Sequence, residues 1–446
     1  MFRLSRTGRL LLAAVGAPAG GSPARLDGAA AASGPAPDAG GPATTHPRCR
    51  PSAHDLDRAD RLASLSEAAL LHGVGGYLAA LLGRFGSGPR TLAALVPVLE
   101  EGRTLTRRAR DDLARLAAVL DAEGVPWVVL KGPAAARLHH LRAPAPASAF
   151  AWAHPTGPGA PTDPGAPDRD REAAPFPLRL YGDLDILIAP EMRTLVRDRL
   201  ARLGARPLRE RAPSPTAHQP APSTRADGAA PRTAGRPPRP MATADEPGQE
   251  AWQLPGGTIL DLHWDLVHRP QARAWYRIPV ATLLARRRRV TSGEVTCPVL
   301  EATDAVLHLA LHAGLHGGWR LIWLKDIERA VRLEAPDWTV LVERARRWGA
   351  VDPVWLALAR ARGLLGAIIP QGALHRLQPS RAARLAALAL ALATPAVPLC
   401  RPSGLARRLA LAVRPDARPH LHRRPFPPGE ELEGEVAGRC GHQGVE

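Results

Sequence analysis

Lysine and cysteine are scarce in this chain, and both scarcities limit what the protein can be. Lys131 and Lys325 are the only lysines, so the formal net charge of +17 comes almost wholly from arginine. A bias towards arginine over lysine is typical of an overall amino-acid composition and only weakly indicates nucleic acid binding. The 4 cysteines lie far apart without a Cys-x-x-Cys pair, which argues against a disulfide framework and a zinc site.

Long apolar runs are also missing. The longest, Leu385 to Ala393 with its neighbours, is too short to cross a bilayer. Near the start, three arginines precede an apolar stretch from Leu10 to Ala17, which imitates a signal or transit peptide only weakly. We therefore expect a cytoplasmic protein with no membrane partner.

Proline and glycine, with 47 and 41 residues, gather in blocks that divide the chain. Between the blocks, helical periodicity and short apolar runs predict an α/β (α+β) fold, with a small mixed β-sheet between two helical regions. Two blocks are long insertions, which can loop out because loop-closure entropy grows slowly with length. We expect a disordered N-terminal segment (1–50), a helical region (51–122), a core (123–300) with disordered insertions at 143–175 and 207–250, a C-terminal helical region (301–400) and a loose tail (401–446).

The segment Arg179–Ile188 carries the strongest chemical signal. Its apolar residues predict a buried strand, on which Asp183 and Asp185 project to the same side because their positions differ by two. Two neighbouring carboxylates repel each other unless a cation lies between them, and Mg²⁺ prefers oxygen ligands shared with phosphates. A strand-end turn with two solvated acids is the alternative interpretation.

Two further predicted strands supply the other parts of a nucleotidyl-transferring site. The strand Trp127–Leu130 leads into Lys131 and Gly132, where a lysine charge and backbone N–H groups would bind a triphosphate. The strand 258–263 carries Asp261, which would hold a second metal ion or act as a base towards the acceptor hydroxyl. Attack at the α-phosphorus would release pyrophosphate.

Together these motifs resemble an uncharacterised nucleotidyltransferase family of the DNA polymerase β-like superfold. The resemblance covers about residues 60–366 apart from the insertions, and its motifs are Leu130-Lys131-Gly132, Arg179-x-x-Gly182-Asp183-x-Asp185, Leu260-Asp261-Leu262-His263-Trp264 and Arg320-Leu321-x-Trp323-x-x-Asp326. It implies a Mg²⁺-dependent, two-metal enzyme that uses an NTP, expected to be ATP, on an unknown acceptor. The implied catalytic and metal residues are Asp183, Asp185 and Asp261; the implied nucleotide-binding residues are Lys131, Gly132, Arg179 and Gly182.

Several residues keep two interpretations. Arg179 could reach phosphate or pair with a site carboxylate, and Asp265 is the alternative to Asp261 as third acid. The histidines His308, His312 and His316 share a helix face, where packing or an acceptor-side role is favoured over a metal. Asp326 is an ordinary helix-face charge or a support for the site.

Two other functions remain open at this stage. One is a nucleotide-binding scaffold that kept the fold without turnover. The other is an RNA-binding module that uses the run Arg286–Arg289, although a solvated basic face is the commoner explanation and nucleic acid is not favoured. Neither a Walker-type lysine motif nor a dinucleotide fingerprint occurs, which disfavours those nucleotide folds.

Overall fold

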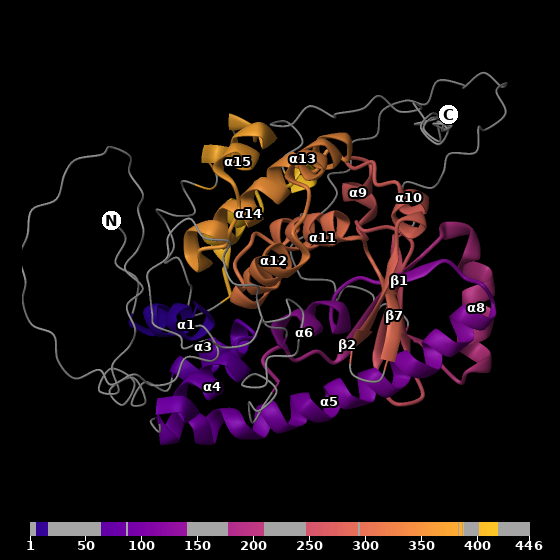
Figure 1. Ribbon diagram of the computed structural model, residues 1–446, viewed down its shortest axis with the longest axis horizontal. Coiled ribbons are helices and arrows are strands. Elements are labelled where there is room, and N and C mark those ends of the chain that lie inside the picture. The colour runs from indigo at the N-terminus through magenta and orange to yellow at the C-terminus, as the bar shows by residue number, and fades with distance from the viewer. Residues whose placement is uncertain are drawn as a thin grey trace, which may run out of the picture.

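A computed structural model describes residues 6–16, 64–85, 88–140, 177–208, 247–292, 295–381, 383–385, 387 and 401–417. Figure 1 shows the sheet with a long helix along one side and a group of C-terminal helices along the other. The two insertions expected from the sequence fall almost entirely outside the described residues. The mixed α/β fold is confirmed.

Seven strands of the described part form one mixed sheet. Their order is β3 (Arg206–Leu208), β4 (Gln249–Gln253), β5 (Ile259–His263), β2 (Asp183–Ile188), β1 (Trp127–Val129), β7 (Val295–Val299) and β6 (Arg288–Ser292). In the middle, β2 runs parallel to β5 and antiparallel to β1. The predicted strands are therefore neighbours, which brings three distant parts of the chain to one place.

One face of the sheet packs against α5 (Pro89–Ala122) and against α8 (Arg193–Arg202), which follows the short turn η1 (Pro190–Met192). The side chains of Leu184, Ile186 and Ile188 point to this face and share a buried cluster with leucines of α5. Because strand side chains alternate, Asp183 and Asp185 project from the other face.

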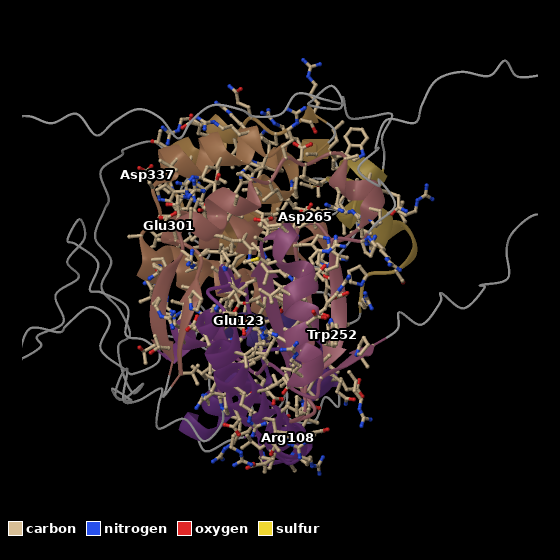
Figure 2. All side chains as sticks on the ribbon, turned by 90° about the vertical axis from the view of Figure 1, so that its right-hand side faces the viewer. Arg108, Glu123, Trp252, Asp265, Glu301 and Asp337 are labelled. Atoms are coloured by element: carbon tan, nitrogen blue, oxygen red, sulfur yellow. The ribbon has the colours of Figure 1, made fainter. Side chains whose placement is uncertain are left out.

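On that other face, one buried cluster joins the sheet to the C-terminal helices α11 (Ala302–Leu315), α12 (Leu321–Glu334), α13 (Trp338–Arg347), α14 (Val351–Leu365) and α15 (Gln371–Leu377), and to α6 (Pro133–His140), α9 (Pro270–Arg273) and α10 (Val280–Ala285). Two carboxylates cap these helices: Glu301 accepts the Thr303 N–H at 3.0 Å, and Asp337 accepts the Thr339 N–H at 2.8 Å. Figure 2 shows both caps on the same side of the molecule.

The N-terminal helices α1 (Arg6–Gly16), α3 (Ser64–Leu71) and α4 (Gly75–Phe85) form a third buried cluster with the start of α5. Helix α1 differs from the expectation that residues 1–50 lack structure. It forms because Leu10, Leu11, Ala14 and Val15 make one apolar face, which is buried in this cluster. The apolar run read as a weak targeting signal is thus packed against the fold.

Other differences from the sequence prediction are local. The helices α11 to α15 lie in the region 301–400 that was expected to be helical, and α5 is a single helix of 34 residues in the expected helical region 51–122. The strands β3, β4, β6 and β7 were not predicted, and the ends of the 207–250 block belong to β3 and β4. In the tail expected to be loose, the structure has α17 (Gly404–Ala410) and the short turn η2 (Pro415–Ala417). Among the described helices, none combines the length and apolar character needed to cross a bilayer.

Candidate active site

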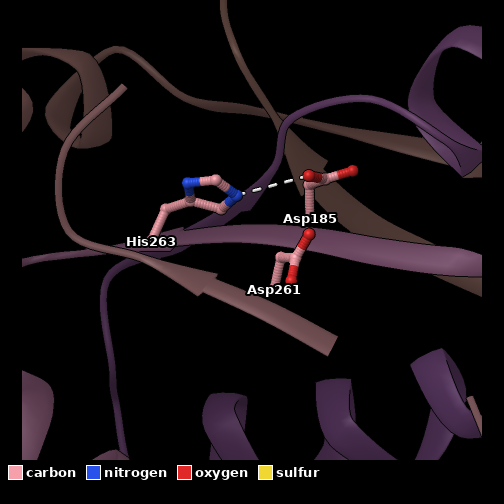
Figure 3. Close-up of side chains that lie close together, drawn as sticks. All are labelled: Asp185, Asp261 and His263. Carbon is pink, nitrogen blue, oxygen red and sulfur yellow. Dashed lines mark hydrogen bonds and ion pairs between the residues drawn. The ribbon is translucent and has the colours of Figure 1, made fainter. Parts of the chain in front are cut away.

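Asp185 and Asp261 lie side by side on the face of the sheet that meets the C-terminal helices. The register of the parallel pair β2–β5 places Asp185 directly opposite Asp261. Paired residues on adjacent strands point to the same side, so both carboxylates project together (Figure 3). The sequence predicted this convergence of two of its three acids.

His263 completes a cluster of three side chains that could hold a metal ion. It lies two residues after Asp261 on β5, and its Nε2 atom is 3.3 Å from Oδ1 of Asp185 (Figure 3). One ligand atom from each of Asp185, Asp261 and His263 lies within 4.8 Å of the other two. Two carboxylate oxygens and an imidazole nitrogen are ordinary ligands of divalent ions, so the donor set fits a metal ion.

The turn after β1 brings Lys131 to the same carboxylates. The Leu130 N–H donates to the carbonyl oxygen of Asp185 at 2.9 Å, which fixes the end of β1 against β2. Gly132 follows with a φ of +55°, and a Cβ atom there would lie 3.3 Å from the carbonyl oxygen of Asp183. The ammonium nitrogen of Lys131 is 2.6 Å from Oδ1 of Asp185.

The two neighbouring carboxylates titrate in opposite directions. Burial opposes the ionisation of Asp185, but the charge of Lys131 and the hydrogen bond with His263 outweigh it and hold the pKa of this carboxyl well below its usual range. Burial raises the pKa of Asp261, and the negative charge of Asp185 raises it further. Lys131 therefore stands beside two carboxylates, Asp185 with a lowered pKa and Asp261 with a raised one.

Two other predicted site residues, Asp183 and Gly182, lie at the edge of this cluster. Asp183 is the first residue of β2, on the same face as Asp185, but it is exposed and outside the group of three. A Cβ atom at Gly182 would meet only the Leu105 side chain at 3.5 Å, so the structure shows no need for glycine there. Their roles stay predictions.

Arg179 pairs with Asp326, for which the sequence left open an ordinary helix-face charge or a support for the site. Its Nε atom donates to Oδ1 of the buried Asp326 on α12 at 3.1 Å, and its Nη2 atom donates to Oδ2 at 3.2 Å. His139 on α6 lies 2.7 Å from the same carboxylate through Nε2 and 2.6 Å from the Tyr77 hydroxyl through Nδ1. The negative charges of Asp183 and Asp185 help to raise the pKa of Arg179, which shows that this network lies close to the cluster.

Helix α5 holds the approaches to both acid-bearing strands. The Thr106 hydroxyl donates to the carbonyl oxygen of Tyr181 at 2.8 Å, just before β2. The Asp112 carboxylate accepts the Gly256 N–H at 3.1 Å and the Thr258 N–H at 3.4 Å, just before β5. These bonds fix where the two strands begin, and so help to set the register that brings Asp185 opposite Asp261.

The three histidines of α11 form a row of packed rings. His312 lies with its ring centroid 4.8 Å from His316, and both rings are 5.3 Å from the ring of Trp323 on α12. Burial lowers the pKa of His308 to about 3 and that of His316 to about 4, so both are neutral at pH 7. In the described part of the chain, these three rings do not form a group with metal-binding spacing.

The arginine run is taken up by ion pairs within the protein. Arg286 pairs with Asp304, Arg288 with Glu334, and Arg289 with Asp121. The fourth arginine, Arg287, donates to the carbonyl oxygen of Leu284. Three of the four arginines of this run therefore neutralise carboxylates of the fold.

The comparison with protein families agrees with this geometry. Residues 174–366 match the model of an uncharacterised nucleotidyltransferase family. The match to this family confirms the resemblance for the part that holds β2, β5 and the helices α11 to α14; Lys131 and Gly132 lie ahead of it. No curated protein matches the chain.

His263 was not among the residues assigned to the site from the sequence. Its signal was present, because positions 261 and 263 of a strand share one face. On this strand only Asp261 was assigned as a ligand, and the imidazole of His263 was passed over.

Proposed function

We propose that this protein is a metal-dependent nucleotidyltransferase that moves a nucleoside monophosphate from an NTP to an acceptor. The observation that carries the proposal is the placement of Asp185 opposite Asp261, with Lys131 beside them. The family match at residues 174–366 supports nucleotidyl transfer as the class of reaction. ATP is the expected nucleotide, and the acceptor is not assigned.

Each residue has a role in this proposal. Asp185 and Asp261 hold a divalent ion, which when bound supplies positive charge to the phosphates. Lys131 would bind the triphosphate, because a lysine on a flexible stem can turn from Asp185 towards the phosphates. The positive φ of Gly132 would let the backbone of the turn at the start of α6 come close to the triphosphate.

The reaction is a displacement at the α-phosphorus. The acceptor oxygen forms a bond to this phosphorus, the bond to the bridging oxygen breaks, and pyrophosphate leaves. The exposed Asp183 lies on the same face as the ligands and is the carboxylate left to take the proton of the acceptor or to bind a second ion. Acceleration comes from positioning and charge neutralisation.

The test is release of pyrophosphate from each of the common NTPs, with Mg²⁺ or Mn²⁺ and a cell extract as the source of acceptors. We expect Asp185→Asn to lower the rate on the order of 10²- to 10³-fold, the cost of one group that stabilises the transition state. Asp265→Asn is the matched control, since Asp265 lies outside the cluster and pairs with Arg273 at 2.8 Å.

Two results would contradict the proposal. Pyrophosphate release that Asp185→Asn leaves unchanged would place the activity elsewhere. Tight NTP binding without release from any nucleotide would favour a nucleotide-binding scaffold, in which Lys131 neutralises Asp185 permanently.

A further inference from the structure

The imidazole of His263 takes part in the same cluster as the two carboxylates. Its Nε2 atom, not its Nδ1 atom, faces Oδ1 of Asp185, and the His263 side chain is buried on the face that carries Asp185 and Asp261. The cluster therefore offers two oxygens and one nitrogen towards a common point. An all-carboxylate site would offer oxygen alone.

The spacing of this long hydrogen bond also fits two ligands of one ion. Nitrogen-to-oxygen hydrogen bonds in proteins are commonest at about 2.9–3.0 Å. Two ligand atoms at right angles, each about 2.1 Å from a metal ion, lie about 3 Å apart and move further apart as the angle opens. The distance from His263 to Asp185 is 3.3 Å, whereas the Lys131 ammonium is only 2.6 Å from the same oxygen.

We propose that His263 is a metal ligand, and that the site takes a first-row transition metal ion, such as Mn²⁺, in preference to Mg²⁺. Mg²⁺ is bound almost wholly through oxygen, whereas imidazole is a ligand of transition metal ions, whose affinity for mixed nitrogen and oxygen sites exceeds that of Mg²⁺. This inference rests on the metal site of the proposed function and replaces the Mg²⁺ expected from the sequence. It concerns the ion alone, so it can be tested without an acceptor.

The experiment is Mn²⁺ binding to the full chain without nucleotide, followed by electron paramagnetic resonance. Free Mn²⁺ gives the affinity, and pulsed spectra report nitrogen coupled to the bound ion. We expect nitrogen coupling in the wild type and its loss in His263→Asn, with Mn²⁺ affinity reduced on the order of 10- to 100-fold. Competition with Mg²⁺ gives the preference between the two ions.

Two further variants separate ligation from folding. His263→Asp restores a three-ligand site made of oxygen, so we expect bound Mn²⁺ without nitrogen coupling and a preference shifted towards Mg²⁺. His308→Leu is the matched control, because His308 is a buried imidazole on α11 that lies outside the cluster. We expect its spectra and affinity to equal those of the wild type.

The outcomes separate this inference from the proposed function. Mn²⁺ bound to the wild type without nitrogen coupling, undiminished coupling in His263→Asn, or no Mn²⁺ binding would each overturn the ligand assignment. Nitrogen coupling in a protein that releases no pyrophosphate would keep the ligand and contradict the transferase. The opposite result is a wild type that releases pyrophosphate but shows no nitrogen coupling, with release lost in Asp185→Asn. This result would keep the transferase and contradict His263 as a ligand.

Discussion

Two buried carboxylates of this protein, Asp185 and Asp326, have the same kinds of partners and different surroundings. Each contacts one basic side chain and one imidazole: Lys131 and His263 at Asp185, and Arg179 and His139 at Asp326. In both, burial opposes ionisation and these partners outweigh it, so that each pKa lies below its usual range.

The difference lies in what each set leaves unsatisfied. Around Asp326, the guanidinium of Arg179 bonds both carboxylate oxygens, and His139 bridges to Tyr77. Burial lowers the pKa of His139 to about 4, so it is neutral at pH 7 and the charges there balance. Around Asp185, a second acid stands opposite and a single lysine faces both. We call Asp326 with Arg179 and His139 the balanced set, because its charges cancel; such a set stabilises the fold. We call Asp185 and Asp261 with Lys131 the unbalanced set, because two carboxylates share one lysine; we infer that a bound cation completes it.

The largest effect should come from breaking the balanced set. We expect Asp326→Ala to lower the free energy of unfolding by about 3–5 kcal/mol, because it removes the carboxylate that Arg179 bonds and leaves its charge largely buried. Asp185→Asn should lower it by less, since the partly exposed Lys131 can turn to water and the repulsion from Asp261 is removed. Urea unfolding of both variants measures the two changes in the free energy of unfolding. Equal changes would show that both sets stabilise the fold to the same extent.

The sequence allowed the unbalanced set to be predicted better than the balanced one. Asp183 and Asp185 are two positions apart on a strand, so their common face follows from local geometry. Asp261 was found because its strand carries an acid in an apolar run. The partner of Arg179, by contrast, is 147 residues away, and their contact depends on how α12 packs against the rest of the fold. No local pattern contains that information.

The strands show the same limit. β1, β2 and β5 are apolar and buried, and all three were predicted. β6 reads Arg288-Arg289-Val290-Thr291-Ser292 and lies at an edge of the sheet, where its arginines pair with Glu334 and Asp121. An edge strand with so few apolar residues gives a weak periodic signal, which is why it was read as a basic face.

A smaller effect should come from the neutral histidine next to the unbalanced set. Burial lowers the pKa of His308 to about 3, so the unfolded chain binds its proton first as the pH falls below 6.5. Stability contributed by the neutral form is therefore lost with decreasing pH, by about 2 kcal/mol between pH 7 and pH 5. We expect His308→Leu to reduce the loss of the free energy of unfolding between pH 7 and pH 5 by this amount, because it removes the titrating group. Urea unfolding at each pH measures this free energy.

The control for that measurement is the exposed His375, which bonds Gln371 at 2.9 Å. His375→Gln should leave the pH dependence as in the wild type. Other buried histidines, such as His139 and His316, leave part of the slope in place, so only a slope in His308→Leu equal to that of the wild type would contradict the prediction.

The smallest effect concerns the repulsion between the carboxylates of Asp185 and Asp261. The pKa of Asp261 is raised by burial and by Asp185, so its ionised form opposes folding. For an acid of raised pKa, stability is greatest below the unfolded pKa and is lost as the pH rises through the folded pKa. We therefore expect Asp261→Asn, with a chelator at pH 7, to raise the free energy of unfolding by up to about 1 kcal/mol, the scale of two like charges placed opposite each other.

The gain in Asp261→Asn should shrink as the pH is lowered, because the wild-type carboxyl then takes up its proton and loses the repulsion from Asp185. It should also reverse when Mn²⁺ is added, because a bound ion stabilises only the protein that keeps its ligands. Asp183→Asn is the matched control, since Asp183 is exposed on the same strand face and should change the urea midpoint little. A loss of stability in Asp261→Asn at pH 7 would mean that Asp261 already has a balancing partner, and that the charge difference between the two carboxylate sets does not exist.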